Sequence, residues 1–196
     1  MAPKTLESPF TRPMEPHHAE RRSYLDGPER SWGAIIASIA ICHTAGLLGI
    51  LSGHDGMKSR WYRKLRKPDF TPPNSIFGPV WNVLYTLMGL ALYKVWQRRY
   101  TPEGKSALKW FAAQLALNAS WTPAFFGGRS VTGGLGIISA LAAVLPISIG
   151  KASQVSRPAG WLLLPYFAWV AFATVLNGAI AALNPRQVKK ERSRWF

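Results

Sequence analysis

The segment Trp61–Leu90, WYRKLRKPDFTPPNSIFGPVWNVLYTLMGL, changes character halfway along its length. Up to Pro73 it mixes basic and aromatic residues, a composition typical of a membrane interface. From Ile76 it is apolar, and Pro79 suits a helix start because the N–H that proline lacks would be unbonded there. We therefore predict a loop at a membrane surface, followed by a helix that forms one wall of a cavity within the membrane.

The loop is expected to be an irregular lid over that cavity. Three prolines within a few residues prevent a continuous helix. The residues that we assign to the lid are Trp61, Tyr62, Pro68, Pro72 and Pro73.

The positions of the carboxylates indicate which segments cross the membrane. The mean hydropathy of the 196 residues is close to zero, at +0.01, because polar tails dilute apolar blocks. Five of the nine Asp and Glu residues precede Ser31, and the other four lie in connections or in the tail. A charge at the bilayer centre costs at least about 2.5 kcal/mol. Apolar blocks free of carboxylates are therefore predicted to be membrane spans.

The predicted fold is an all-α membrane protein with a bundle of five transmembrane helices. Each block has roughly 20 residues, the length that crosses a hydrocarbon core about 30 Å thick. The expected spans are about 33–52, 77–97, 107–126, 131–150 and 160–183, within a domain of residues 33–184. A disordered extension, 1–32, would precede this domain, and a basic tail, 185–196, would follow it.

Small residues and prolines predict local features of the spans. The first span has a small residue at every fourth position and then a GxxxG pattern, which lets helices approach closely in lipid. We expect a kink in the third span and an interruption of the fourth, each at a proline. These residues are Ser38, Cys42, Gly46, Gly49 and Gly53 in the first span, Pro123 in the third and Pro146 in the fourth.

The formal charge of +15 is assigned to loops beside anionic headgroups. No folded polar domain is left over to bind nucleic acid, so that partner is not expected. Lys and Arg divide evenly, 12 to each side of the predicted bundle, so the positive-inside rule gives no orientation. The single cysteine excludes an intrachain disulfide.

Three of the nine tryptophans lie deeper than an interfacial belt explains. By helical rise, Trp81 and Trp121 are roughly 6–8 Å, and Trp169 about 15–20 Å, below the face that carries the loop. Helical spacing puts Tyr85 and Met88 beside Trp81, Asn118 and Phe125 beside Trp121, and Phe172, Ala173 and Leu176 beside Trp169. These side chains would form an aromatic chamber for a flat, mostly apolar ligand with weakly polar groups. The alternative is that the rings only pack the helices together.

Chemistry beyond binding has little support in the sequence. His43 lies near the middle of the first span and is a weak candidate for a haem-iron ligand; a neutral histidine hydrogen-bonded to a neighbouring helix is the favoured interpretation. His54 is a second weak candidate. We find no paired carboxylates, no nucleophile with a base and no Cys/His metal cluster, so no enzyme, no metal site and no required cofactor are predicted.

Four motifs resemble the translocator protein family, also called tryptophan-rich sensory proteins or peripheral-type benzodiazepine receptors. The motifs are WYRKLRKPDFTPP (61–73), GPVWNVLYTLMG (78–89), LALNASWTPAFF (115–126) and PYFAWVAFATVLN (165–177). The resemblance covers roughly residues 57–177 in the family's order.

The resemblance implies a five-helix bundle, often dimeric, that binds porphyrin or haem, sterols and synthetic benzodiazepine-type ligands. It implies ligand contacts from Trp81, Trp121, Trp169, Asn118 and Ala173. We add Asn177, which ends the last motif. The resemblance also favours a location in the mitochondrial outer membrane, with the endoplasmic reticulum or secretory membranes as the alternative.

One departure from the family bears on the ligand. Animal members have tyrosines and an arginine after the ATVLN of the fifth helix, as a proposed cholesterol motif, whereas Gly178–Leu183 here contains neither. We therefore favour binding, transport or scavenging of tetrapyrrole over sterol import. The alternatives are light-dependent porphyrin degradation and a structural or regulatory role with lipid in the chamber.

Overall fold

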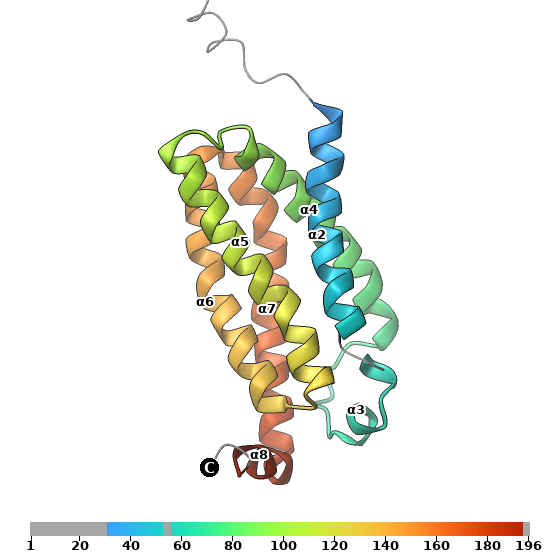
Figure 1. The fold of residues 1–196 in the computed structure, drawn as a ribbon. Coiled ribbons are helices and arrows are strands. Elements are labelled where there is room, and N and C mark those ends of the chain that lie inside the picture. Colours follow the sequence, from blue (N-terminus) through green and yellow to red (C-terminus); the bar gives the residue numbers. More distant parts are fainter. Residues whose placement is uncertain (1–30, 53–55, 194–196) are drawn as a thin grey trace, which may run out of the picture. The chain divides into compact units, whose positions relative to one another are not determined.

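The computed structural model describes residues 31–52 and 56–193. The predicted disorder of 1–30 and the candidates His54 and Gly53 lie outside this range. The described secondary structure is entirely helical (Figure 1). Its elements are α2 (Trp32–Ser52), the 3₁₀ turn η2 (Gly56–Lys58), α3 (Arg60–Lys64), α4 (Asn74–Trp96), α5 (Pro102–Thr122), the π-helical turn η3 (Pro123–Gly127), α6 (Val131–Val155), α7 (Arg157–Leu183) and α8 (Pro185–Arg192).

The five long helices close into a ring. Contacts run from α2 to α5, α5 to α6, α6 to α7, α7 to α4 and α4 back to α2. Large buried side chains fill the centre of the ring, among them Met88, Phe111, Leu145 and Tyr166. α2, α5 and α7 run in one direction and α4 and α6 in the other, so the loop with α3 and the C-terminal α8 lie at the same end (Figure 1).

Four of the described helices, α2, α4, α6 and α7, are long and apolar enough to cross a membrane. α5 has 21 residues but falls short in hydropathy, because Glu103, Lys105 and Lys109 occupy its first two turns and Gln114 and Asn118 follow. The structure thus supports an all-helical membrane protein with four candidate spans.

Helix starts follow from capping side chains. The hydroxyl of Thr101 accepts from Gly104 N at the start of α5, and that of Ser130 accepts from Gly133 N at the start of α6. Pro102 and Pro158 lie in the first turns of α5 and α7, where the missing N–H removes no helical bond.

Two predictions about prolines were wrong. Pro79 does not open the second span, because α4 begins at Asn74 after the extended Pro73, which leaves Pro79 inside the helix. Pro146 does not interrupt the fourth span, because α6 is continuous from Val131 to Val155. The Pro146 ring lies on the exposed face, so one missing backbone bond leaves the inward packing intact. At Pro123 the expected distortion is present, as the wide turn η3.

The predicted stripe of small residues in the first span faces the bundle. Ser38, Cys42, Gly46 and Gly49 of α2 are all buried. A Cβ on Gly46 would overlap the Tyr85 ring of α4, so glycine lets α2 approach that ring.

Candidate functional site

Asn118 of α5 joins two tyrosines from neighbouring helices. Its Oδ1 accepts a hydrogen bond from the Tyr85 hydroxyl at 2.9 Å, and its Nδ2 donates to the Tyr166 oxygen at 2.9 Å. Both ends of the amide are therefore used in an almost fully buried position. The Trp81 ring stacks on Tyr85 with centroids 5.2 Å apart and meets the edge of Tyr166 at 6.2 Å. The amide thus fixes the two rings against which Trp81 lies.

Trp121 is held by a second amide. Its indole N–H donates to Asn177 Oδ1 at 3.3 Å, and Asn177 Nδ2 donates to Val131 O at 3.2 Å. The Trp121 ring stacks on Phe125, with centroids 5.0 Å apart. These bonds connect α5, α6 and α7 at the level of η3.

Trp169 lies between aromatic rings of α4 and α7. Phe77 meets its edge at 5.8 Å, and Phe172 lies 5.6 Å away. Trp81, Trp121 and Trp169 are all half-buried and pack against the same core cluster, as Ala173 does. The three predicted tryptophans thus come from three helices and pack against one core cluster.

The loop rests on these aromatic rings. Trp61 meets the edge of Phe125 at 5.4 Å, and Tyr62 meets Phe126 at 5.3 Å. Together with Leu65 and Leu176 they form a second cluster, against which Trp121 and Phe172 also pack.

Phe70, farther along the loop, lies 6.4 Å from Phe172. Pro68 and Pro72 are half-buried, and Pro73 is exposed just before α4. The segment predicted as a lid therefore contacts the chamber residues at both of its ends.

The Lys67 side chain makes several contacts within the loop. Its ammonium donates to Tyr62 O at 2.9 Å and to Leu65 O at 3.3 Å, and lies 4.4 Å from the centre of the Tyr62 ring. Burial lowers the pKa of Lys67 and raises the pKa of the Tyr62 hydroxyl. Lys67 thus stabilises the conformation of the loop through contacts within the loop.

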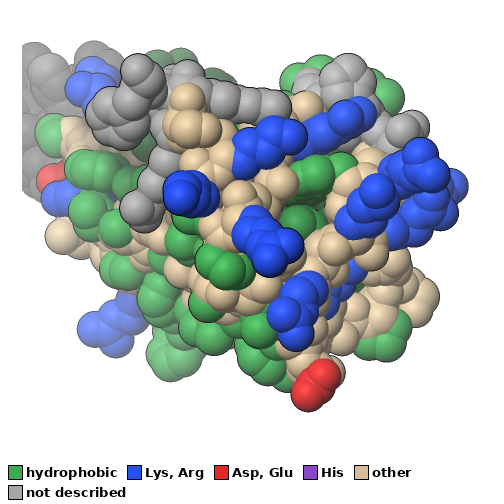
Figure 2. Space-filling model, turned by 90° about the horizontal axis from the view of Figure 1, so that it is seen from below, with side chains coloured by type: hydrophobic (Ala, Val, Ile, Leu, Met, Phe, Trp, Pro, Cys, Tyr) green, Lys and Arg blue, Asp and Glu red, His purple; other side chains and the backbone are tan. Residues whose placement is uncertain are grey.

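The loop end of the bundle is strongly cationic. Figure 2 shows Lys and Arg side chains around an apolar patch on this face, with few acidic side chains in view. The described cations are Lys58, Arg60, Arg63, Lys64, Arg66, Lys67, Arg129, Arg186, Lys189 and Lys190. This charge favours anionic groups near the loop.

His43 has a protein partner. Its Nε2 lies 3.2 Å from the Thr86 hydroxyl of α4, and its ring lies 5.7 Å from that of Tyr85. The hydrogen bond between helices matches the favoured interpretation. Across residues 31–52 and 56–193 no three His, Cys, Asp or Glu side chains gather as metal ligands would.

Sequence reasoning missed several residues that organise this region. Tyr166 is fully buried at the centre, and Phe77 covers Trp169. Tyr166 lies within the motif 165–177, whereas Phe77 lies just before the motif 78–89. Only the packing of the helices reveals the contacts of these two residues. Trp61 has a buried indole N–H without an acceptor in the described structure.

Helices of membrane length around an aromatic centre define an integral membrane protein of the α-helical bundle class. Residues 38–183 match the model of the TspO/MBR family, and the chain belongs to that family. This confirms the resemblance found in the motifs.

Relatives from three organisms agree with this assignment. The chain is 38% identical to the Tryptophan-rich protein TspO of Chlorobaculum tepidum over 152 residues, 75% of this chain and 93% of that protein. It is 40% identical to the Translocator protein of Homo sapiens over 120 residues, 60% of this chain and 71% of that protein. It is 33% identical to the Tryptophan-rich sensory protein of Cereibacter sphaeroides over 153 residues, 78% of this chain and 92% of that protein.

Proposed function

We propose that this protein binds a tetrapyrrole, porphyrin or haem, among Trp81, Tyr85, Trp121 and Trp169 beneath the loop. The observation that carries the proposal is the convergence of three half-buried indoles from α4, α5 and α7 on one core cluster. Indole and phenol rings offer flat faces to a planar macrocycle.

Polar groups at the loop suit the carboxylates of such a ligand. The unpartnered indole N–H of Trp61 is a donor at the inner surface of the loop. The surrounding Lys and Arg side chains supply positive charge at the same end of the bundle (Figure 2). An anionic amphiphile therefore fits this arrangement better than a neutral sterol does.

In this proposal α5 is the fifth span. Its 21 residues reach about 31 Å, the length of its neighbour α2. Beyond Lys109 its exposed residues are Ala112, Ala113, Ala116 and Ser120, while Gln114 and Asn118 point inward. Carriage of the ligand between membranes or partners, location in the mitochondrial outer membrane and a homodimer remain predictions.

Quenching of tryptophan fluorescence by protoporphyrin tests the proposal. We expect Trp81→Phe and Trp169→Phe each to raise the dissociation constant about five-fold, since a lost ring contact of this kind is worth about 1 kcal/mol. Trp96→Phe is the matched control, because this exposed ring lies at the other end of α4. Equal titrations for all four proteins would remove the basis of the proposal.

Product analysis after illumination separates binding from degradation. If the protein only binds the porphyrin, its absorption spectrum stays intact after irradiation of the complex. New bilin-like products that form only with the protein would favour the degradation alternative.

A further inference from the structure

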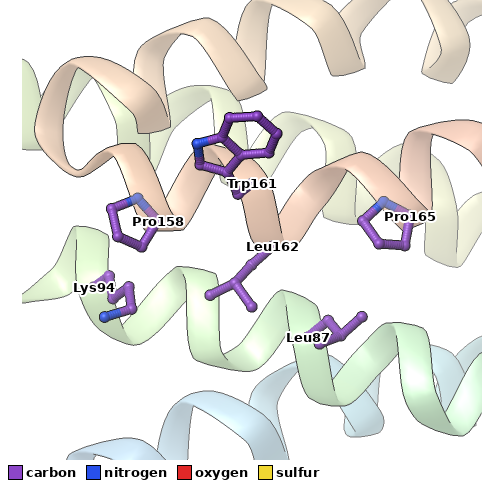
Figure 3. A pocket seen from close by; sticks show the side chains of 6 residues that line it. All are labelled: Leu87, Lys94, Pro158, Trp161, Leu162 and Pro165. Carbon is purple, nitrogen blue, oxygen red and sulfur yellow. The ribbon is translucent and has the colours of Figure 1, made fainter.

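A groove of about 460 Å³ lies between α4 and α7, outside the aromatic cluster. Leu87, Lys94, Pro158, Trp161, Leu162 and Pro165 line it. Figure 3 shows Lys94 and Pro158 at one end of the groove and Leu87 and Pro165 toward the other. α4 and α7 are both candidate membrane spans, and Trp161 and Pro165 of the lining are exposed, so in a membrane the groove would face lipid.

The groove runs inward from the end of the bundle opposite the loop. Lys94 is in the last turn of α4, and Pro158 is in the first turn of α7. Leu87 and Pro165 are each seven residues deeper, about 10 Å along the helices. The groove thus has a polar outer end and an apolar interior, with the 70% exposed Trp161 beside it.

Lys94 is the only charged side chain among the described residues that line the groove. Its ammonium makes no hydrogen bond or ion pair with the described residues, whose carboxylates are Asp69 and Glu191 at the loop end and Glu103 at the start of α5. The helix ends nearby add further cations, which are Arg98, Arg99, Lys105, Lys109, Lys151 and Arg157. None of the described carboxylates is therefore the partner of Lys94.

We propose that this groove binds one anionic phospholipid, with its headgroup phosphate at Lys94 and an acyl chain along Leu87, Leu162 and Pro165. The unpaired ammonium complements the headgroup, and the apolar floor complements the chain. A sterol would leave the ammonium without a counter-charge, and a second copy of this chain would bring the same cationic end against it. Free phosphate would leave the apolar floor uncovered.

Brominated lipids that quench Trp161 test the proposal. The protein is reconstituted in phosphatidylcholine vesicles that contain a small fraction of dibrominated phosphatidylglycerol or of dibrominated phosphatidylcholine. The Trp161 signal is the difference between the parent protein and Trp161→Phe. We expect phosphatidylglycerol to be enriched about five-fold at Trp161, the effect of one lysine on one lipid charge near the surface.

Lys94 substitutions assign the enrichment to this groove. Lys94→Met should abolish the enrichment of phosphatidylglycerol, and Lys94→Arg should retain it. The Arg variant also controls for misfolding caused by substitution at this position. Lys105→Met, which removes an exposed cation from the same end of the bundle, should leave it unchanged. Equal quenching by both lipids, an enrichment that survives Lys94→Met, or a Trp161 shielded from both lipids by a protein partner or a sterol would overturn the proposal.

Discussion

Asn118 and Gln114 lie one turn apart on α5 and differ in how their amides are used. Asn118 is satisfied at both ends, by Tyr85 and Tyr166. Gln114 is fully buried, and neither its Nε2 nor its Oε1 has a partner among the described residues. An unsatisfied buried amide costs about 1–3 kcal/mol, whereas a satisfied one stabilises the fold. Neighbouring amides therefore make opposite contributions to the stability of the bundle.

Substitution of the two amides should change stability in opposite directions. Gln114→Met keeps the unbranched shape and removes the unpaired atoms, so we expect the free energy of unfolding to rise by about 1–2 kcal/mol. Asn118→Leu leaves two tyrosine hydroxyls without partners, so we expect a fall of about 2–3 kcal/mol. Denaturant titrations in detergent, followed by circular dichroism, measure both. A clear loss of stability in Gln114→Met would mean that the Gln114 amide has a bonding partner.

The close contact between α2 and α4 depends on Gly89. A Cβ at Gly89 would overlap Cα of Ile39 on α2, whereas a Cβ at Gly136 of α6 meets nothing within 4 Å. Two helix backbones this close leave no room for a side chain, and backbone cannot yield as a rotamer can. Gly89 is therefore a spacing residue between two spans.

Gly89→Ala and Gly136→Ala form a matched pair. We expect Gly89→Ala to cost about 1–3 kcal/mol, because α2 must move away from α4. Gly136→Ala should be neutral or stabilise the fold by up to about 1 kcal/mol through helix propensity. Thermal unfolding of the two variants compares them directly. Equal stability would show that α2 is free to shift.

Helix α8 is joined to α6 through one carboxylate. Glu191 accepts hydrogen bonds from the backbone of Val131 and Thr132 and from the hydroxyls of Ser130 and Thr132, at 2.6–3.0 Å. Gln187 donates to it from the preceding turn of α8, at 2.8 Å. Burial opposes ionisation, but the donors outweigh it and lower the pKa of Glu191 below its ordinary 4.5.

The stabilising effect of Glu191 should depend on pH. Since its pKa is lower in the folded protein, its contribution is complete above pH 4.5 and is lost as the pH falls below that value toward the lowered pKa. We expect Glu191→Gln to cost about 2 kcal/mol at pH 7 and little at strongly acidic pH. Unfolding measured at both pH values tests this.

Asp69→Asn is the control, because the Asp69 carboxylate is exposed and should change stability by less than about 0.5 kcal/mol. A Glu191→Gln effect that does not change with pH would show that the carboxylate does not act through its charge.

The elements differ in how well the sequence alone specifies them. The apolar blocks without carboxylates predict α2, α4, α6 and α7, because the apolar composition that a helix needs in lipid can be read from that helix alone. α8 could not be predicted in this way, because its eight residues are mostly polar and its position depends on hydrogen bonds between Glu191 and residues about sixty positions earlier. The extra turns of α4 and α6 likewise extend beyond the apolar blocks.

At the scale of the whole molecule, the sequence predicts which residues share a depth but not which residues touch. Depth along the helices puts Trp81, Trp121 and Trp169 in one half of the bundle. The order of helices around the ring, which makes Tyr166 the neighbour of Asn118, comes from packing between distant segments.

The loop, α7 and α8 are tied together at one end of the molecule. Asn184, between α7 and α8, accepts from Arg66 N at 3.0 Å and donates to Arg66 O at 2.8 Å. Gln187 of α8 donates to Arg129 O at 3.3 Å. Asn184 thus holds the middle of the loop at the end of α7, although Arg66 and Asn184 are 118 residues apart in the sequence.

Asn184→Ala should release the loop without unfolding the bundle. The loss of two hydrogen bonds costs about 1–2 kcal/mol, so we expect tryptic cleavage within Arg60–Lys67 to become about 5–30-fold faster. Asn74→Ala is the matched control, because this exposed asparagine lies at the same end and makes no side-chain bond among the described residues. If the loop covers the bound tetrapyrrole, porphyrin should also dissociate faster from Asn184→Ala, by a similar factor, in stopped-flow fluorescence. Faster cleavage with an unchanged rate of porphyrin dissociation would support the Asn184 contact but contradict the role of the loop as a lid. An unchanged rate of cleavage would show that other contacts hold Arg66 in place.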